Sequence, residues 1–136
     1  MRVFKTKVFA RFARRKRITE KEICEAARRA AKGLIDADLG GGVIKQRLAR
    51  KGQGKSGGFR SIILFQRNEK MFFVYGFAKS DRDNIRKDEL IAFRKLADAM
   101  FILDNKALVA VTRNGTIMEV RCHEQTISER SPGSRA

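Results

Sequence analysis

The chain has 136 residues, of which 43% are hydrophobic, a size and composition that fit one folded domain and leave little room for a second. Lys and Arg number 31 against 15 Asp and Glu, so the formal net charge is +16, which predicts attraction to polyanions such as nucleic acid or an acidic protein. No apolar run reaches the roughly 18–20 residues of a membrane-spanning helix, and the basic N-terminus is not followed by the apolar segment of a secretory signal, so we expect a cytoplasmic protein that does not bind a membrane.

The first third of the chain predicts two helices. After a short extended start over residues 3–5, apolar residues recur at helical spacing over residues 6–15. Thr19 and Glu22 then form the T-x-x-E pattern of a capping box, which predicts that a second helix begins there and ends near Gly33.

The middle third predicts strands, because the apolar period changes from about 3.6 residues to about two. The predicted strands cover residues 43–49, 59–66 and 71–78. The second and third are apolar along most of their length, so we expect them to be buried on both faces at the centre of a sheet. The glycine run at residues 40–42 is predicted to be a loop.

The last third predicts helices over residues 86–103 and 104–113, a strand over residues 116–121 and a disordered polar tail over residues 125–136. Runs of helices beside consecutive strands are typical of an α+β fold. We therefore expect two N-terminal helices packed on one face of a small twisted antiparallel sheet, followed by a C-terminal helix and a final strand.

One part of the chain carries charges of a single sign. No acidic residue occurs between Leu39 and Asn68, and the cations there are Lys45, Arg47, Arg50, Lys51, Lys55, Arg60 and Arg67. Because a solvated face normally mixes both signs, this stretch is better explained by a bound polyanion than by solubility alone. The basic run over residues 14–17 fits either a solvated helix end or a further RNA contact. The residues of the acid-free stretch that we expect to bind RNA are Lys45, Arg47, Lys51 and Lys55.

The same stretch contains a glycine-rich loop over residues 50–57. Without side-chain bulk, its main-chain N–H groups could contact a phosphate backbone, and a mobile hairpin loop is the alternative. Ala49 to Ser56 also match a relaxed P-loop pattern, A-x-x-x-x-G-K-S. A true P-loop leads into a helix, whereas these residues lead into a predicted strand, so we do not expect a nucleoside triphosphatase.

Cysteine and histidine are too few for a metal site or a disulfide framework. His123 is the only histidine, and it stands beside Cys122 without the second pair of ligands that a zinc site needs. Cys24 and Cys122 are the only cysteines, so we expect two free thiols. No metal and no cofactor is predicted.

Cationic chemistry on phosphate is the catalytic possibility that remains. RNA is cleaved when its 2′-hydroxyl attacks the adjacent phosphate in line, and a protein assists by alignment, by proton removal and by stabilising the developing charge. Arg60, Lys79 and Arg82 stand at the ends of the two central strands, where a sheet would present them together. Tyr75 shares a strand face with Phe77 and Lys79, and it is predicted either to stack on a base or to be a core tyrosine with a satisfied hydroxyl.

Three segments carry a family resemblance: residues 36–42 (Asp-Ala-Asp-Leu-Gly-Gly-Gly), 52–60 (Gly-Gln-Gly-Lys-Ser-Gly-Gly-Phe-Arg) and 75–85 (Tyr-Gly-Phe-Ala-Lys-Ser-Asp-Arg-Asp-Asn-Ile). They resemble the RelE/ParE superfamily, and in particular the RelE/HigB-like toxins of type II toxin–antitoxin modules. The resemblance implies a toxin domain over residues 1–124, with the polar tail outside it. It also implies a metal-independent endoribonuclease that cleaves mRNA on the ribosome, and a cognate antitoxin encoded by the neighbouring gene.

The resemblance assigns catalytic roles to particular residues. The strand arginine of the Gly-Phe-Arg motif corresponds to Arg60, and the loop cations after the third strand correspond to Lys79 and Arg82. The hairpin lysines correspond less closely, because the loop here is longer and richer in glycine than in RelE itself. Arg86 stands in approximate register with a C-terminal tyrosine of RelE, which leaves His123 or Tyr75 as the substitute base.

Two other functions fit the same sequence. ParE-like relatives inhibit DNA gyrase by binding it without catalysis, and a shared fold cannot separate that function from RNA cleavage. A plain nucleic-acid-binding domain without toxicity is the third possibility. The dense cationic hairpin favours RNA over the gyrase-inhibitor function.

Overall fold

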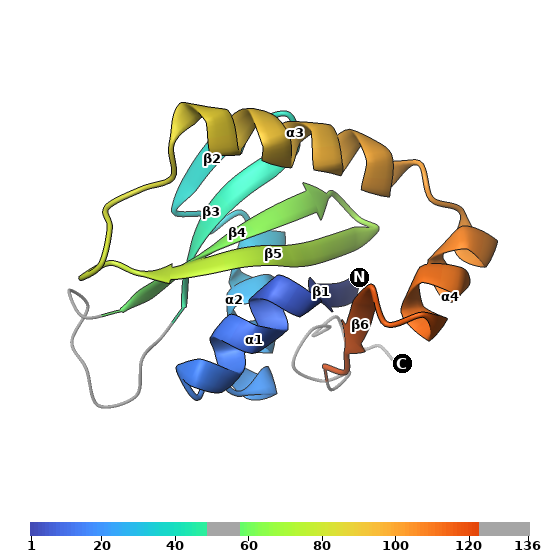
Figure 1. Cartoon of the computed structure of the whole chain (residues 1–136), viewed down its shortest axis with the longest axis horizontal. Helices are drawn as coiled ribbons and strands as arrows, with labels where there is room; N and C mark the ends of the chain where they lie inside the picture. Colours follow the sequence, from blue (N-terminus) through green and yellow to red (C-terminus); the bar gives the residue numbers. More distant parts are fainter. Residues whose placement is uncertain (49–57, 123–136) are drawn as a thin grey trace.

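The computed structural model describes residues 1–48 and 58–122 of the chain (Figure 1). Its strands are β1 (Arg2–Thr6), β2 (Ala37–Gly40), β3 (Val43–Leu48), β4 (Phe59–Gln66), β5 (Lys70–Ala78) and β6 (Ile117–Val120). Its helices are α1 (Lys7–Arg15), α2 (Glu20–Ala31), α3 (Lys87–Phe101) and α4 (Asn105–Arg113). The strands form one six-stranded sheet in the order β2-β3-β4-β5-β1-β6.

The sheet is mixed. Strands β3, β4 and β5 pair antiparallel, as predicted, and β2 extends this meander at one edge. Strand β1 pairs parallel with β5 and antiparallel with β6, so the first strand of the chain lies inside the sheet. Strands β4 and β5 are therefore central, which confirms the interpretation of their two apolar runs.

The predicted fold is wrong in its arrangement, although the α+β class is right. The described chain begins with a strand, the sheet is mixed rather than antiparallel, and helices cover both faces rather than one. The start over residues 3–5 is too short to show a period, so its place between β5 and β6 has no local signal. Strand β2 is not among the predicted strands, and its last residue, Gly40, is the first residue of the loop predicted over residues 40–42.

Three layers result (Figure 1). Helices α1 and α2 pack on one face, where Phe9 and Ala27 join a buried cluster with Ile63. Helices α3 and α4 pack on the other face, where Ala97 and Leu108 join a second buried cluster. Because both faces are covered, the central strands need apolar side chains in both directions.

Helix α2 begins as the sequence predicts. The Thr19 hydroxyl accepts from the Glu22 backbone N–H at 3.2 Å, and the Glu22 carboxylate accepts from the Thr19 N–H at 2.8 Å. Gly33 follows the helix with a φ of +88°, a conformation that glycine adopts at little cost, and its N–H donates to the Ala30 carbonyl. The capping-box prediction is confirmed.

The expectation of two free thiols is wrong. Cys24 and Cys122 form a disulfide, with Cα atoms 5.7 Å apart. Cys24 lies on the buried side of α2, and Cys122 follows β6, whose Val120 packs in the same cluster. The two cysteines are 98 residues apart in the sequence, so only the tertiary fold brings them together.

Several sequence predictions fall outside the described residues. These are the loop over residues 50–57 with Lys51 and Lys55, the P-loop-like pattern, His123 and the tail over residues 125–136. Within residues 1–48 and 58–122, no helix is long and apolar enough to cross a membrane.

Candidate functional site

One face of the sheet gathers four of the predicted site residues. In the antiparallel register, Arg47 of β3 pairs with Arg60 of β4, and Lys45 of β3 pairs with Ile62 of β4. Ile62 in turn pairs with Tyr75 of β5. Directly paired residues point to the same face of a sheet, so Lys45, Arg47, Arg60 and Tyr75 lie on the face that α3 covers further along.

A β-bulge decides which face Tyr75 occupies. Ile62 pairs with Tyr75 while Ile63 pairs with Phe73, so Val74 is the extra residue in β5. The bulge changes the alternation, and Val74 and Tyr75 both contact the cluster beneath α3. Without it, Tyr75 would point toward α1 and away from the cations.

Arg60 is the buried cation of this face. Only 5% of its surface is exposed, and its Nε lies 3.2 Å from a carboxylate oxygen of Asp36, just before β2. Its Nη1 donates to the Phe59 carbonyl at 3.3 Å. Asp36 is itself positioned by Gln46, whose fully buried side chain accepts from the Asp36 backbone N–H at 3.0 Å. Arg60 is therefore held in one orientation by fixed partners.

Arg82 is held by a second carboxylate. Its Nη2 donates to one Glu89 oxygen at 2.6 Å and its Nη1 donates to the other at 3.2 Å. The same Nη1 donates to the Tyr75 hydroxyl at 3.0 Å, and Nε donates to the Asn84 carbonyl at 2.9 Å. The Arg82 guanidinium lowers the pKa of Glu89, aided by the Arg86 backbone N–H, and Glu89 raises the pKa of Arg82.

Three other cations are not paired. Within the described part of the chain, Lys45, Arg47 and Lys79 form no ion pair with a carboxylate. Lys79 is exposed directly after β5, where its backbone N–H donates to the Gly58 carbonyl at 3.3 Å. Lys45 and Arg47 are half-buried on the sheet face. Lys45 and Arg47 therefore carry uncompensated charge on this face, and Lys79 adds a further unpaired charge at the end of β5.

Tyr75 packs against aromatic rings, and its hydroxyl has a hydrogen-bond partner. Its ring lies 6.2 Å from the Phe77 ring and 5.9 Å from the Phe93 ring of α3, measured between centroids. Its hydroxyl accepts from Arg82, yet the residue is only half-buried. The tyrosine is thus packed and hydrogen-bonded, and it retains an accessible part.

Sequence reasoning missed the carboxylates that hold the two arginines. In the sequence, Asp36 stands within the first of the three family-like segments, and no motif points to Glu89 as a partner of Arg82. In neither pair do the acid and the arginine lie in the same helix or strand, so no helix or strand period relates them. The strand pairing and the turn before α3 create both contacts.

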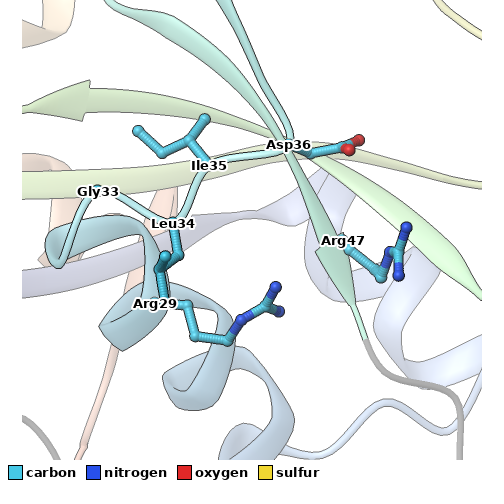
Figure 2. A pocket seen from close by; sticks show the side chains of 6 residues that line it. All are labelled: Arg29, Gly33, Leu34, Ile35, Asp36 and Arg47. Carbon is cyan, nitrogen blue, oxygen red and sulfur yellow. The ribbon is translucent and has the colours of Figure 1, made fainter.

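An open pocket of about 410 Å³ lies beside Asp36, and Arg29, Gly33, Leu34, Ile35, Asp36 and Arg47 line it (Figure 2). Arg29 comes from α2 and Arg47 from β3, and the side chains of Arg29, Asp36 and Arg47 project toward the same side of the pocket. Among the residues that the structure describes, no group of three or more His, Cys, Asp or Glu side chains could hold a metal ion.

Comparison with known proteins identifies the family. A search of curated proteins found no match to this chain. The family model described as RelE toxin of the RelE/RelB toxin–antitoxin system matches residues 1–120, which includes every strand and helix of the structure. Such a toxin is one half of a pair, so a cognate antitoxin is implied as its partner. With its layered sheet and its cationic face, the chain belongs to the RelE toxin family and is a toxin of a toxin–antitoxin system.

Proposed function

We propose that this toxin is an endoribonuclease that cleaves mRNA, on the ribosome, without a catalytic metal. The observation that supports this best is the pair of unpaired cations Lys45 and Arg47 on the sheet face that also carries Arg60 and Tyr75, together with the unpaired Lys79 directly after β5. Phosphate contacts by Lys and Arg supply most of the affinity of a protein for a nucleic-acid strand.

The reaction that fits these groups uses the RNA itself as the nucleophile. The 2′-hydroxyl loses its proton to a base and attacks the adjacent phosphorus, and the bond from phosphorus to the 5′-oxygen of the next nucleotide breaks. The products are a 2′,3′-cyclic phosphate and a 5′-hydroxyl, which takes up a proton. Guanidinium and ammonium groups stabilise the additional negative charge on the phosphate oxygens in the transition state.

Each residue has a role in this proposal. Lys45 and Arg47 bind the RNA backbone, and Lys51 and Lys55, which lie outside the described residues, are proposed to extend that contact. Arg60 and Lys79 stabilise the charge on the scissile phosphate. Asp36 and the Phe59 carbonyl hold Nε and Nη1 of Arg60, whereas Nη2 forms no hydrogen bond among the described residues and can donate to a phosphate oxygen.

Tyr75 and Arg82 form the remaining part of the proposed site. Arg82 donates to the Tyr75 hydroxyl and so orients the ring. Tyr75 is proposed to stack on a base or to take up the 2′ proton, and His123 is the other proposed base. A pH–rate profile of Tyr75→Phe separates these roles, because only loss of a proton acceptor changes the shape of the profile.

The test is induction of the toxin with and without its antitoxin, followed by mapping of mRNA 5′ ends. The double variant Lys45→Gln/Lys79→Gln should cut mRNA about 100-fold more slowly, since loss of one transition-state stabiliser, here Lys79, typically costs that much, and loss of Lys45 also weakens RNA binding. The control Lys95→Gln/Lys106→Gln removes the same charge from exposed positions on α3 and α4, and should cut like the unmodified toxin.

Other outcomes would replace the proposal. Wild-type cutting by the Lys45/Lys79 variant in a folded protein would show that the site is wrong. Double-strand DNA breaks without mRNA cuts would favour a ParE-like inhibitor of DNA gyrase. Steeply salt-dependent nucleic-acid binding without growth arrest would favour a plain binding domain.

A further inference from the structure

The pocket beside Asp36 holds an excess of positive charge. Arg29 and Arg47 are both half-buried, and neither forms an ion pair within the described residues. The one carboxylate at the pocket belongs to Asp36, which is already paired with Arg60 at 3.2 Å. By contrast, Arg28, the neighbour of Arg29 on α2, is paired with Glu25. The two pocket arginines are thus left with donors that an anion can use.

The shape of these side chains favours phosphate. Guanidinium groups match phosphate oxygens in a planar, two-point geometry, and they are less strongly hydrated than ammonium groups. Figure 2 shows the Arg29 and Arg47 side chains on the same side of the pocket, with Leu34 beside Arg29. Leu34 also lines the pocket, and it is 57% exposed. A ligand in the pocket can therefore contact its apolar side chain.

The pocket is continuous with the proposed RNA interface. Arg47 pairs directly with Arg60 across β3 and β4, and Asp36, which lies just before β2 on the far side of β3, forms an ion pair with Arg60. If the scissile phosphate of an RNA strand lies at Arg60, a neighbouring nucleotide of the same strand would therefore lie at this pocket.

We propose that the pocket is a phosphate subsite in which Arg29 and Arg47 grip one non-scissile phosphodiester of the bound RNA, with the adjoining nucleoside against Leu34. This deepens the proposed function and rests on it for the identity of the ligand as RNA. Arg29 becomes an RNA-binding residue on α2, outside the acid-free stretch that the sequence singled out.

The experiment measures binding of the full chain to a 2′-O-methyl RNA oligonucleotide, which cannot be cleaved because its 2′-oxygen is blocked. Arg29→Gln should weaken binding about 5- to 10-fold, the usual effect of losing one charge-assisted hydrogen-bonded contact. The slope of log affinity against log salt concentration should become shallower by about 0.7, the value for one phosphate contact on a single strand.

Two further variants make the result specific. Arg11→Gln removes an equivalent charge from the exposed surface of α1, and should leave both the affinity and the salt slope unchanged. Arg29→Lys keeps the charge but loses the two-point geometry, so it should retain the salt slope while binding more weakly than the unmodified chain. If Arg29 served folding alone, Arg29→Gln would lower the melting temperature of the chain. Arg29→Lys would then not retain the salt slope of the unmodified chain.

The outcome separates this inference from the proposed function. If Arg29→Gln binds RNA with the unmodified affinity and slope, the subsite is wrong even where mRNA is cut. If Arg29→Gln weakens binding of the antitoxin and leaves the RNA curve unchanged, the pocket takes a carboxylate and the inference also fails. If the RNA effect appears but the toxin cuts no mRNA, the subsite stands and the endoribonuclease proposal falls.

Discussion

Arg82 links three parts of the molecule through one guanidinium group. It donates to Glu89 in α3, to the Tyr75 hydroxyl in β5 and to the Asn84 carbonyl in the connecting turn. Glu89 also accepts from the Arg86 backbone N–H at 2.6 Å, so the same carboxylate satisfies the N-terminus of α3. Arg82 is therefore better suited to hold Tyr75 in place than to bind a phosphate on its own.

The Arg82–Glu89 pair should give part of the stability a pH dependence. Because the pKa of Glu89 is lowered in the folded protein, its contribution is present above the pKa of an unfolded glutamate and is lost as the pH falls through the lowered value. We expect Glu89→Gln to reduce the free energy of unfolding by about 1–2 kcal/mol at pH 7, and by less at pH 3, where protonation of the glutamate in the unfolded chain reduces the contribution of the pair.

Urea denaturation at the two pH values measures this difference. The control Asp98→Asn removes an exposed carboxylate of α3 that has no ion pair among the described residues, and should change the unfolding free energy by no more than about 0.5 kcal/mol. An equal loss for Glu89→Gln at both pH values would show that charge does not contribute to the pair.

Helix α1 packs on β5 through a close contact at a glycine. A Cβ atom at Gly76 would lie 2.3 Å from a ring carbon of Phe12, a distance at which the ring or the backbone must move. The Phe12 ring also meets the Phe59 ring edge-on, with centroids 5.7 Å apart. The β-bulge next to Gly76 sets this arrangement, because it turns Gly76 toward α1 and Tyr75 toward the cations.

Gly76→Ala should therefore destabilise the packing of α1 on the sheet. We expect the free energy of unfolding to fall by about 1–3 kcal/mol, the usual cost of overpacking a filled core. Thermal or urea unfolding measures the change. In a Phe12→Leu background, where the ring is absent, the added methyl group should cost clearly less. The same penalty in both backgrounds would mean that the strand itself, and not Phe12, rejects the alanine.

The disulfide links the second helix of the chain to the segment that follows its last described strand. Cys24 in α2 and Cys122 after β6 are 98 residues apart, so the bond closes a loop that contains most of the sheet. A crosslink of this length restricts the unfolded chain strongly. Disulfides persist mainly in oxidising environments and are rare in the reducing cytosol. The bond therefore does not fit the cytoplasmic location that the sequence predicts.

Reduction should lower the stability of the whole fold. We expect the oxidised chain to lose about 2–5 kcal/mol of unfolding free energy when dithiothreitol is added, as for other disulfides that close long loops. Unfolding curves with and without the reductant measure this change. The variant Cys24→Ser cannot form the bond and should unfold identically in both conditions. No response of the unmodified chain to dithiothreitol would indicate free thiols, as the composition predicts.

Local patterns were enough to predict most helices and strands and the cationic character of the candidate site. Side-chain burial repeats with the period of the local backbone, so β4, β5, α3 and the capping box of α2 are readable from neighbouring residues. The acid-free stretch placed Lys45, Arg47 and Arg60 among the candidates, because the charge of each residue is known from the sequence without the fold. The similarity of short motifs to RelE/HigB-like toxins led to the family that the comparison confirms.

Contacts between distant segments were decided only by the tertiary structure. The insertion of β1 between β5 and β6, the second helical layer, the Cys24–Cys122 bond and the carboxylate partner of Arg60 all join residues far apart in the chain. Such contacts depend on how whole elements pack and on where the chain reverses direction. A window of neighbouring residues holds no information about either. For the same reason, charge alone could not separate the arginines that hold the site together from the cations left available for RNA.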